Sequence, residues 1–318
     1  MLEVSDLSVR FDTEDGPVHA VDGLSFELER GEVLGIVGES GCGKTVACLS
    51  LARLLPESAT ATGRVLLEGV DLLALPQRKL REARGRDIAY VFQEPMASLN
   101  PSFTVGRQIG EVLQEHLGLS RSAARERAIE LLQLVHIPAP DRRVDEYPHQ
   151  LSGGMQQRVM IAMAISCEPK VLVADEPTTA LDVTTQMAIL SLMSDIRARL
   201  GTAIVLVTHN LGVVAGIADR VLVMYAGREA EEAPVEDLFD DPQHPYTMGL
   251  LGAIPRHGQE RLQEIPGRVP ALRELPAGCA FFDRCFRAED SCRSAPELQR
   301  VRDAHFVACF RPGLQAIG

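Results

Sequence analysis

The sequence has 318 residues, 46% of them hydrophobic, which suffices for one large domain or for a main domain with an appendage. No apolar run approaches the roughly 18–20 residues that span a bilayer, and the N-terminal MLEVSDLSVRFD lacks the features of a signal peptide, so we expect any membrane role to be peripheral. The net charge of −12, without a block of Lys or Arg, argues against a general nucleic-acid binder, because such binding depends largely on cationic contacts to phosphates.

The first chemical motif lies in EVLGIVGESGCGKTVACLSLARLL, which predicts an apolar strand, a glycine loop and a helix. Residues Gly38 to Thr45 fit the pattern G-x-x-x-x-G-K-[ST]. Glycines let the backbone curl so that successive N–H groups point at one anion, and the helix that follows adds its positive N-terminal dipole. Lys44 is therefore expected to reach the β- and γ-phosphates of a nucleotide, and the Thr45 hydroxyl to ligate Mg²⁺.

A second helix start that could bind an anion lies in YPHQLSGGMQQRVMIAMAI. Ser152 is a good N-cap for the helical pattern that follows, and Gly153 and Gly154 allow a ligand to approach the backbone closely. Without further context this stretch would be only a capped helix.

Two adjacent carboxylates close the next apolar run, in EPKVLVADEPTTALD. The run from Val171 to Ala174 predicts a buried parallel strand, and Pro177 ends it. In P-loop enzymes a carboxylate at the place of Asp175 holds Mg²⁺ through water, and the next, here Glu176, can accept a proton from the attacking water. A solvated turn is the alternative reading of the pair.

The tail from about Val235 is rich in Pro, Gly and Arg and contains a short apolar helix around residues 246–254. Four of the seven cysteines follow, Cys279, Cys285, Cys292 and Cys309, with the spacing C-x5-C-x6-C-x16-C. Thiolates in a reducing compartment suggest a metal, but the C-x2-4-C knuckles of structural zinc are absent. Four cysteines also suit a [4Fe–4S] cluster, with nearby aromatic residues to exclude water. Zinc and free thiols remain the alternatives.

Six motifs in order resemble the nucleotide-binding subunit of an ABC transporter over residues 1 to about 235. GESGCGKT is similar to the Walker A loop, Gln93 in YVFQEP to the Q-loop glutamine, and LSGGMQQR to the signature, with Met155 where Gln is usual. VLVADE is similar to Walker B, ALD ending at Asp182 to the D-loop, and His209 in VLVTHN to the switch histidine.

The resemblance implies an α/β P-loop ABC ATPase domain over 1–235, with a helical subdomain at about 95–165, followed by a small cysteine-rich extension over 236–318. It implies catalytic roles for Glu176, His209 and Gln93, with Gln93 also sensing Mg²⁺. Phe11 falls where the family places an aromatic residue against adenine, although a core phenylalanine is about as good a reading. The residues expected to bind MgATP are Phe11, Gly38, Ser40, Gly41, Cys42, Gly43, Lys44, Thr45, Gln93, Ser152, Gly153, Gly154, Asp175 and Asp182.

Three further stretches, FQEPMASLNP (92–101), DDPQHPYTMGLLGAIP (240–255) and IPGRVPAL (265–272), resemble the ATPases of dipeptide, oligopeptide and nickel importers, some of which carry an iron–sulfur cluster in this tail. The resemblance implies an ATP-hydrolysing subunit at the cytoplasmic face of the membrane. Its partners would be an identical or homologous ATPase, two membrane permeases and an extracytoplasmic solute-binding protein, but no nucleic acid. The alternatives are a nickel or glutathione importer, a soluble ABC ATPase of repair or translation, and a regulatory module that holds ATP without hydrolysing it.

Overall fold

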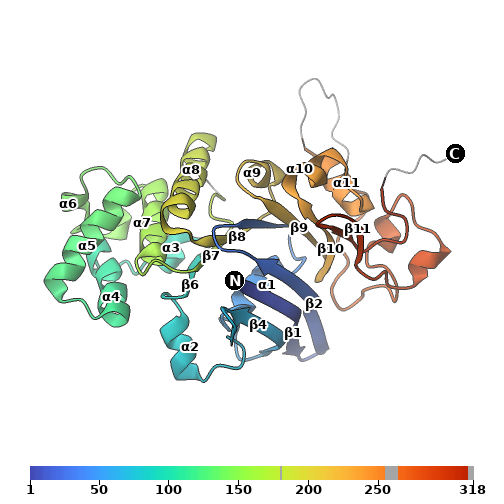
Figure 1. Ribbon diagram of the computed structural model, residues 1–318, viewed down its shortest axis with the longest axis horizontal. Coiled ribbons are helices and arrows are strands. Elements are labelled where there is room, and N and C mark those ends of the chain that lie inside the picture. Colours follow the sequence, from blue (N-terminus) through green and yellow to red (C-terminus); the bar gives the residue numbers. More distant parts are fainter. Residues whose placement is uncertain (180, 255–263, 314–318) are drawn as a thin grey trace. The chain divides into compact units, whose positions relative to one another are not determined.

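The computed structural model describes residues 1–179, 181–254 and 264–313, so Pro255 of the predicted importer motif lies outside the described residues. The chain folds into two compact units (Figure 1). The first unit comprises Met1–Leu28, Val33–Ala74 and Leu206–Gly318, and the second comprises Glu29–Glu32 and Leu75–Val205. Residue 235, where we expect the ATPase domain to end and the extension to begin, lies within the first unit, and this domain limit stays a prediction.

The first unit begins with a four-stranded antiparallel sheet and continues with strands that surround the phosphate loop. Its sheet has the order β2-β1-β4-β5, and a second set of strands has the order β11-β12-β10-β9-β3. The N-terminal elements of the unit are β1 (Leu2–Thr13), β2 (Gly16–Leu28), β3 (Val33–Val37), α1 (Lys44–Ser50), β4 (Ala59–Leu67) and β5 (Val70–Asp71). The later ones are α9 (Leu211–Ala215), β9 (Arg220–Tyr225), β10 (Arg228–Pro234), α10 (Val235–Asp240), α11 (Pro245–Gly252), the 3₁₀ helices η2 (Phe282–Arg284) and η3 (Asp290–Arg293), β11 (Gln299–Arg302) and β12 (His305–Val307).

Strand β3 forms the predicted apolar strand before the glycine loop. All five of its residues are buried, and it pairs in parallel with β9, in the register Ile36 to Leu222. A strand buried on both faces needs apolar side chains at every position, which explains the unbroken run VLGIV. The buried, paired strand therefore fixes the position at which the phosphate loop begins.

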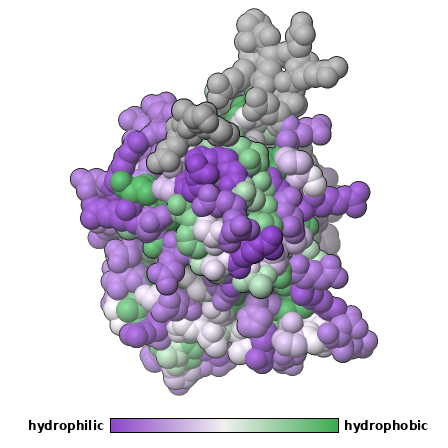
Figure 2. All heavy atoms as spheres, turned by 90° about the vertical axis from the view of Figure 1, so that its right-hand side faces the viewer, coloured by the Kyte–Doolittle hydropathy of each residue, from purple (hydrophilic) through white to green (hydrophobic). Residues whose placement is uncertain are grey.

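The C-terminal extension packs onto the first unit through β12, which pairs antiparallel with β10 in the register Glu231 to Val307. The predicted apolar helix is α11, with Pro245 at its first position. Figure 2 shows the side of the molecule that carries the extension, where hydrophilic residues predominate and hydrophobic ones lie between them. Phe286 and Phe310 are among the exposed apolar side chains of this region.

The second unit carries parallel strands and a group of helices. Strand β6 pairs in parallel with β7, and β8, which leads from this unit into the first, follows β7 in the strand order. The elements are α2 (Gln77–Ala83), β6 (Ile88–Val91), α3 (Pro95–Ser98), α4 (Val105–Leu117), α5 (Arg121–Leu134), α6 (Pro140–Arg143), the 3₁₀ helix η1 (Pro148–Gln150), α7 (Gly153–Ile165), β7 (Val171–Asp175), α8 (Val183–Leu200) and β8 (Ala203–Thr208).

The helices of the second unit begin and end where short polar residues and glycine dictate. The side chains of Thr104, Ser120 and Ser152 each accept a hydrogen bond from the first turn of α4, α5 and α7. Gly118 and Gly201 adopt the left-handed conformation that ends α4 and α8. In the described part of the chain, no helix combines the length and the apolarity needed to cross a bilayer.

Candidate functional site

The phosphate loop of the first unit, Gly38 to Thr45, joins β3 to α1. Gly43 has φ 102°, and a Cβ there would lie 2.3 Å from the Ala20 carbonyl oxygen. A Cβ at Gly38 would lie 2.3 Å from the Met224 carbonyl oxygen. Only glycine fits these two positions, so neighbouring strands hold the backbone of the loop in its curled form.

Lys44 is buried within this loop, with only 6% of it exposed. Its Nζ donates hydrogen bonds to the carbonyl oxygens of Gly38, at 2.8 Å, and Glu39, at 3.0 Å. By contrast, Ser40, Gly41 and Thr45 are exposed. A buried ammonium group therefore lies beneath a loop whose outer residues are open to solvent, as a site for an anionic ligand requires.

In the second unit the structure brings together two of the predicted catalytic residues. Glu176 Oε2 accepts hydrogen bonds from Gln93 Nε2, at 3.2 Å, and from Thr179 Oγ1, at 2.8 Å. Glu176 also has φ 46°, an uncommon conformation for a residue other than glycine, and such backbone strain concentrates at functional sites. Asp175, directly before it, is buried at the end of β7. This part of the chain therefore holds one carboxylate in a fixed orientation beside an amide.

The signature stretch lies at the start of α7. Ser152 Oγ accepts a hydrogen bond from the Met155 N–H at 3.4 Å, and Ser152 and Gly153 are exposed. A Cβ at Gly154 would lie 2.8 Å from Thr185 Cγ2, so α7 and α8 approach closely there. The predicted N-cap geometry is thus present, with its serine accessible from outside.

Asp182 caps α8, the helix next to the signature. It accepts from the Thr185 N–H at 3.0 Å and from the Thr185 hydroxyl at 2.7 Å. These hydrogen bonds, the one from the hydroxyl foremost, lower the pKa of Asp182 below its ordinary value. The D-loop aspartate is therefore an anionic helix cap, and its expected contact with nucleotide stays a prediction.

The other two predicted residues lie in the first unit. His209 is exposed directly after β8, followed by Asn210, which caps α9. Phe11 is half-buried on β1, opposite Val18 on β2 and Ala59 on β4. The roles of His209 at the γ-phosphate and of Phe11 against adenine stay predictions.

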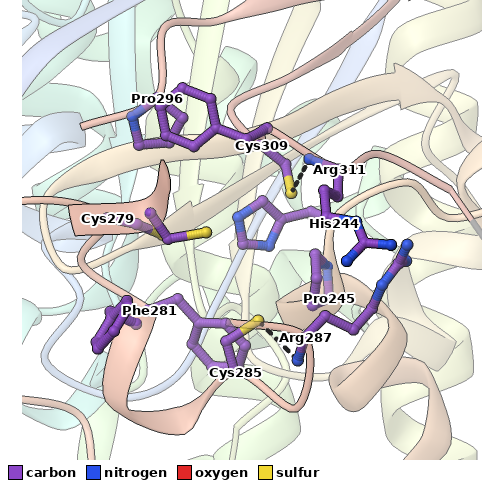
Figure 3. Close-up of a pocket in the computed structure, with 12 residues that line it drawn as sticks. His244, Pro245, Cys279, Phe281, Cys285, Arg287, Pro296, Cys309 and Arg311 are labelled. Atoms are coloured by element: carbon purple, nitrogen blue, oxygen red, sulfur yellow. Dashed lines mark hydrogen bonds between the residues drawn. The ribbon is translucent and has the colours of Figure 1, made fainter. Parts of the chain in front are cut away.

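The four cysteines of the extension line one small cavity, together with His244 and Phe281. Figure 3 shows the sulfur atoms of Cys279, Cys285 and Cys309 directed toward a common space beside the His244 ring. Cysteines that lie up to 30 positions apart in the sequence are thereby gathered in one place. The sequence analysis expected these four cysteines to share one site; the share of His244 in the wall was missed.

Two of the sulfurs accept hydrogen bonds from the backbone two residues further on. The Arg287 N–H donates to Cys285 Sγ and the Arg311 N–H to Cys309 Sγ, each at 3.4 Å. Both arginines also line the cavity. Positive side chains and N–H donors favour sulfur in its anionic form.

Without a cation, burial opposes that anionic form. It raises the thiol pKa values of Cys279 and Cys285, and it raises that of Cys309 to about 11, with a smaller contribution from the other three cysteines. In residues 1–179, 181–254 and 264–313, no three His, Cys, Asp or Glu side chains converge closely enough to hold a single metal ion. The cysteines therefore surround a space without meeting at one point.

Sequence reasoning also missed two residues beside the phosphate loop. Both belong to the extension: the Tyr246 hydroxyl oxygen accepts a hydrogen bond from the Glu39 backbone N–H, and Arg284 donates to the Glu39 carboxylate. No local pattern marks either residue, because each is defined by a partner more than 200 positions away.

Comparison with known proteins identifies the chain. Residues 21–179 match the family described as ABC transporter, and residues 230–292 match the oligopeptide/dipeptide transporter C-terminal region. A probable peptide ABC transporter ATP-binding protein of Sinorhizobium fredii is 52% identical over 317 residues, which cover 98% of this chain and 95% of that protein. The oligopeptide transport ATP-binding protein OppD of Salmonella typhimurium is 48% identical over 314 residues, which cover 98% and 94%.

A solved structure supports the same assignment. The dimeric, post-hydrolysis ATP-binding cassette MJ0796, bound to ADP and Pi, matches with a TM-score of 0.67 and 27% identity over 74% of this chain and 99% of that one. The predicted P-loop fold is thereby confirmed. The chain belongs to the ABC transporter family, as one of its ATP-hydrolysing, ATP-binding proteins.

Proposed function

We propose that this chain energises the import of di- or oligopeptides by hydrolysing ATP. The observation that carries the proposal is the full-length likeness to peptide transport ATP-binding proteins, which extends through the C-terminal region. A nickel or glutathione importer is the alternative within the class, because the ATPase subunit does not itself need to touch the solute.

The hydrolytic step follows from the residues already described. Lys44 and the loop N–H groups would bind the β- and γ-phosphates, and the Thr45 hydroxyl and Asp175 would hold Mg²⁺, which offsets phosphate charge. Glu176, oriented by Gln93 and Thr179, would accept a proton from the water that attacks the γ-phosphorus, so that ADP and phosphate form. Catalysis would then come mainly from positioning and charge stabilisation.

The exposed signature turn points to a second ATPase subunit, identical or homologous. We propose that Ser152 and Gly154 of one subunit contact the γ-phosphate held by the Lys44 loop of the other, with His209 at the same phosphate. The remaining partners would be two membrane permeases and a solute-binding protein, with this chain on the cytoplasmic face of the membrane. The exposure of Ser152 and Gly153 supports this arrangement.

The experiment is reconstitution with the membrane permeases of a peptide importer. Peptide uptake into vesicles should require ATP, and Glu176→Gln should abolish ATP turnover by about 100-fold or more while nucleotide binding persists. Turnover that survives in Glu176→Gln would refute the base assignment. Full ATPase activity without any retained permease would instead favour a soluble ABC ATPase, and ATP binding without wild-type turnover would favour a regulatory module.

We also propose that the cysteine cavity holds a [4Fe–4S] cluster as a structural staple for the extension. The donor set fits: four sulfurs line one cavity, two of them accept backbone N–H hydrogen bonds, and the Arg287 charge favours the thiolate form of Cys285. Zinc is the alternative occupant; it would need four ligands at about 2.3 Å from one point. A brown protein with iron and sulfide in stoichiometric amounts would support the cluster, and zinc without iron would refute it.

A further inference from the structure

Glu39, the second residue of the phosphate loop, is bonded by two residues of the C-terminal extension. Its backbone N–H donates to the Tyr246 hydroxyl oxygen at 2.8 Å. Its carboxylate accepts from both terminal nitrogens of Arg284, Nη1 at 2.7 Å and Nη2 at 3.0 Å. The Glu39 carbonyl meanwhile accepts from Lys44 Nζ. One residue therefore joins the extension to the lysine expected to bind phosphate.

Arg284 is built for this contact. It is only 6% exposed, and its Nε donates to the Pro266 carbonyl at 2.9 Å while Nη1 also lies 3.3 Å from the Tyr225 hydroxyl. Hydrogen bonding to Glu39 raises the pKa of Arg284 above its ordinary value. A two-pronged pair with a buried guanidinium fixes geometry more firmly than an exposed ion pair does.

The charge of Glu39 explains why the pair matters. A carboxylate inside a phosphate loop repels a triphosphate, and Arg284 neutralises it. The Tyr246 hydroxyl, whose ring is buried, fixes the backbone of the same residue. Arg284 thus offsets the negative charge of the loop, and Tyr246 fixes its backbone conformation.

The cysteine segment controls where Arg284 lies. Arg284 ends η2, between Cys279 and Cys285, and is directly followed by Cys285. Phe281, from the same segment, packs edge-on against Tyr225, with ring centroids 5.1 Å apart, and lies tilted against Tyr246 at 5.4 Å. The Arg284 guanidinium therefore lies beside the rings of Tyr225 and Phe281, and Phe281 also lines the cysteine cavity.

We propose that Arg284 and Tyr246 are positioning residues for nucleotide binding, and that through them the cysteine segment sets the affinity of the phosphate loop for ATP. The inference rests on the proposed binding of the ATP phosphates at Lys44, but it requires neither peptide transport nor any particular metal. Because coupling is reciprocal, bound ATP should in turn stabilise the segment from Cys279 to Cys285.

The test is a double-mutant cycle on ATP affinity, measured by titration of the full-length chain with a fluorescent ATP analogue. Arg284→Gln should raise the dissociation constant about 10-fold, because it leaves the Glu39 carboxylate unpaired. Glu39→Gln in the same chain should restore affinity to within about 3-fold of wild type. The dissociation constant of Arg284→Lys should fall between those of wild type and Arg284→Gln, since lysine keeps the charge and loses the two-pronged hydrogen bonding. Tyr246→Phe should weaken binding by about 3-fold.

Steady-state kinetics and a matched arginine supply the controls. KM for ATP should rise in Arg284→Gln while kcat changes less, which a general loss of stability would not produce. Arg302→Gln, in the same extension but paired with Asp241, should leave ATP affinity unchanged. Unaltered affinity in a folded Arg284→Gln protein, or no rescue by Glu39→Gln, would overturn the inference. A wild-type chain that fails to bind ATP would instead refute the proposed function.

Discussion

The phosphate loop and the cysteine cavity are both candidate binding sites for charged groups, but they are assembled differently. The loop takes its groups from eight consecutive residues, Gly38 to Thr45, whereas the cavity takes its sulfurs from positions between Cys279 and Cys309 and a wall from His244. A site built from consecutive residues needs only a strand and a turn of the correct shape. A site built from distant residues needs the extension to be folded, so the cysteine cavity depends on the packing that surrounds it.

The two regions also differ in charge without a ligand. The loop already holds a buried ammonium group and so favours an anion. The cavity holds thiols whose pKa values burial has raised, so its cysteines ionise readily only when a cation compensates them. The loop thus favours an anion as it stands, while the cavity would favour its thiolate form only with the proposed cluster bound.

The largest expected effect comes from a substitution in the phosphate loop that should change ATP turnover without affecting the cysteine cavity. Lys44→Ala should lower ATP turnover by about 100-fold or more, because it removes the charge that faces the phosphates. With the proposed cluster bound, iron content should change little, since the substitution leaves the four cysteines and the pair between Arg284 and Glu39 in place. ATP turnover should be measured with and without permeases. Iron content should be measured separately, by elemental analysis. Iron lost together with turnover would mean that the loop is required to fold the extension.

The reverse experiment breaks the cavity. Cys285→Ser together with Cys309→Ser should abolish iron binding and lower the melting temperature, because metal binding contributes directly to folding free energy. ATP turnover should fall less than in Lys44→Ala. Cys167→Ser, a cysteine outside the cavity, is the matched control and should retain its iron. Full iron content in the double variant would contradict the four-cysteine assignment.

Thiol reactivity sharpens the contrast in the metal-free protein. With Cys309 at a pKa of about 11, its alkylation at pH 7 should be slow and should rise about tenfold per pH unit up to that value. Mass spectrometry of the alkylated peptide gives the rate. Fast alkylation at neutral pH would show that the cavity favours the thiolate even without a cation.

The smallest effect concerns the strand that supports the cavity wall. Burial, reinforced by Glu232, raises the pKa of Glu229 to about 8, well above the ordinary carboxyl value. Its protonated form is therefore preferred in the folded state, and its contribution to stability is lost as the pH rises from about 4.5 through 8. Glu229→Gln should raise the melting temperature by roughly 2–4 °C at pH 9 relative to wild type, with little difference at pH 5. Equal shifts at both pH values would argue against the raised pKa.

Local chemistry made much of the fold and site predictable. Glycines at the phosphate loop, a serine before α7 and an apolar run before Asp175 each dictate backbone conformation within a few residues. The order of these motifs carried the family resemblance. The spacing of the four cysteines suggested a shared site, although not which other residues would line it.

The sequence by itself therefore determined the strand–loop–helix of Lys44, the capped start of α7, and the choice of an ATP-binding fold, because these depend on neighbours along the chain. Only the tertiary structure decided that Gln93 meets Glu176 across 83 positions and that Arg284 meets Glu39 across 245. Such pairs are set by strand register and side-chain packing, which bring distant segments together and leave no periodic trace in the sequence.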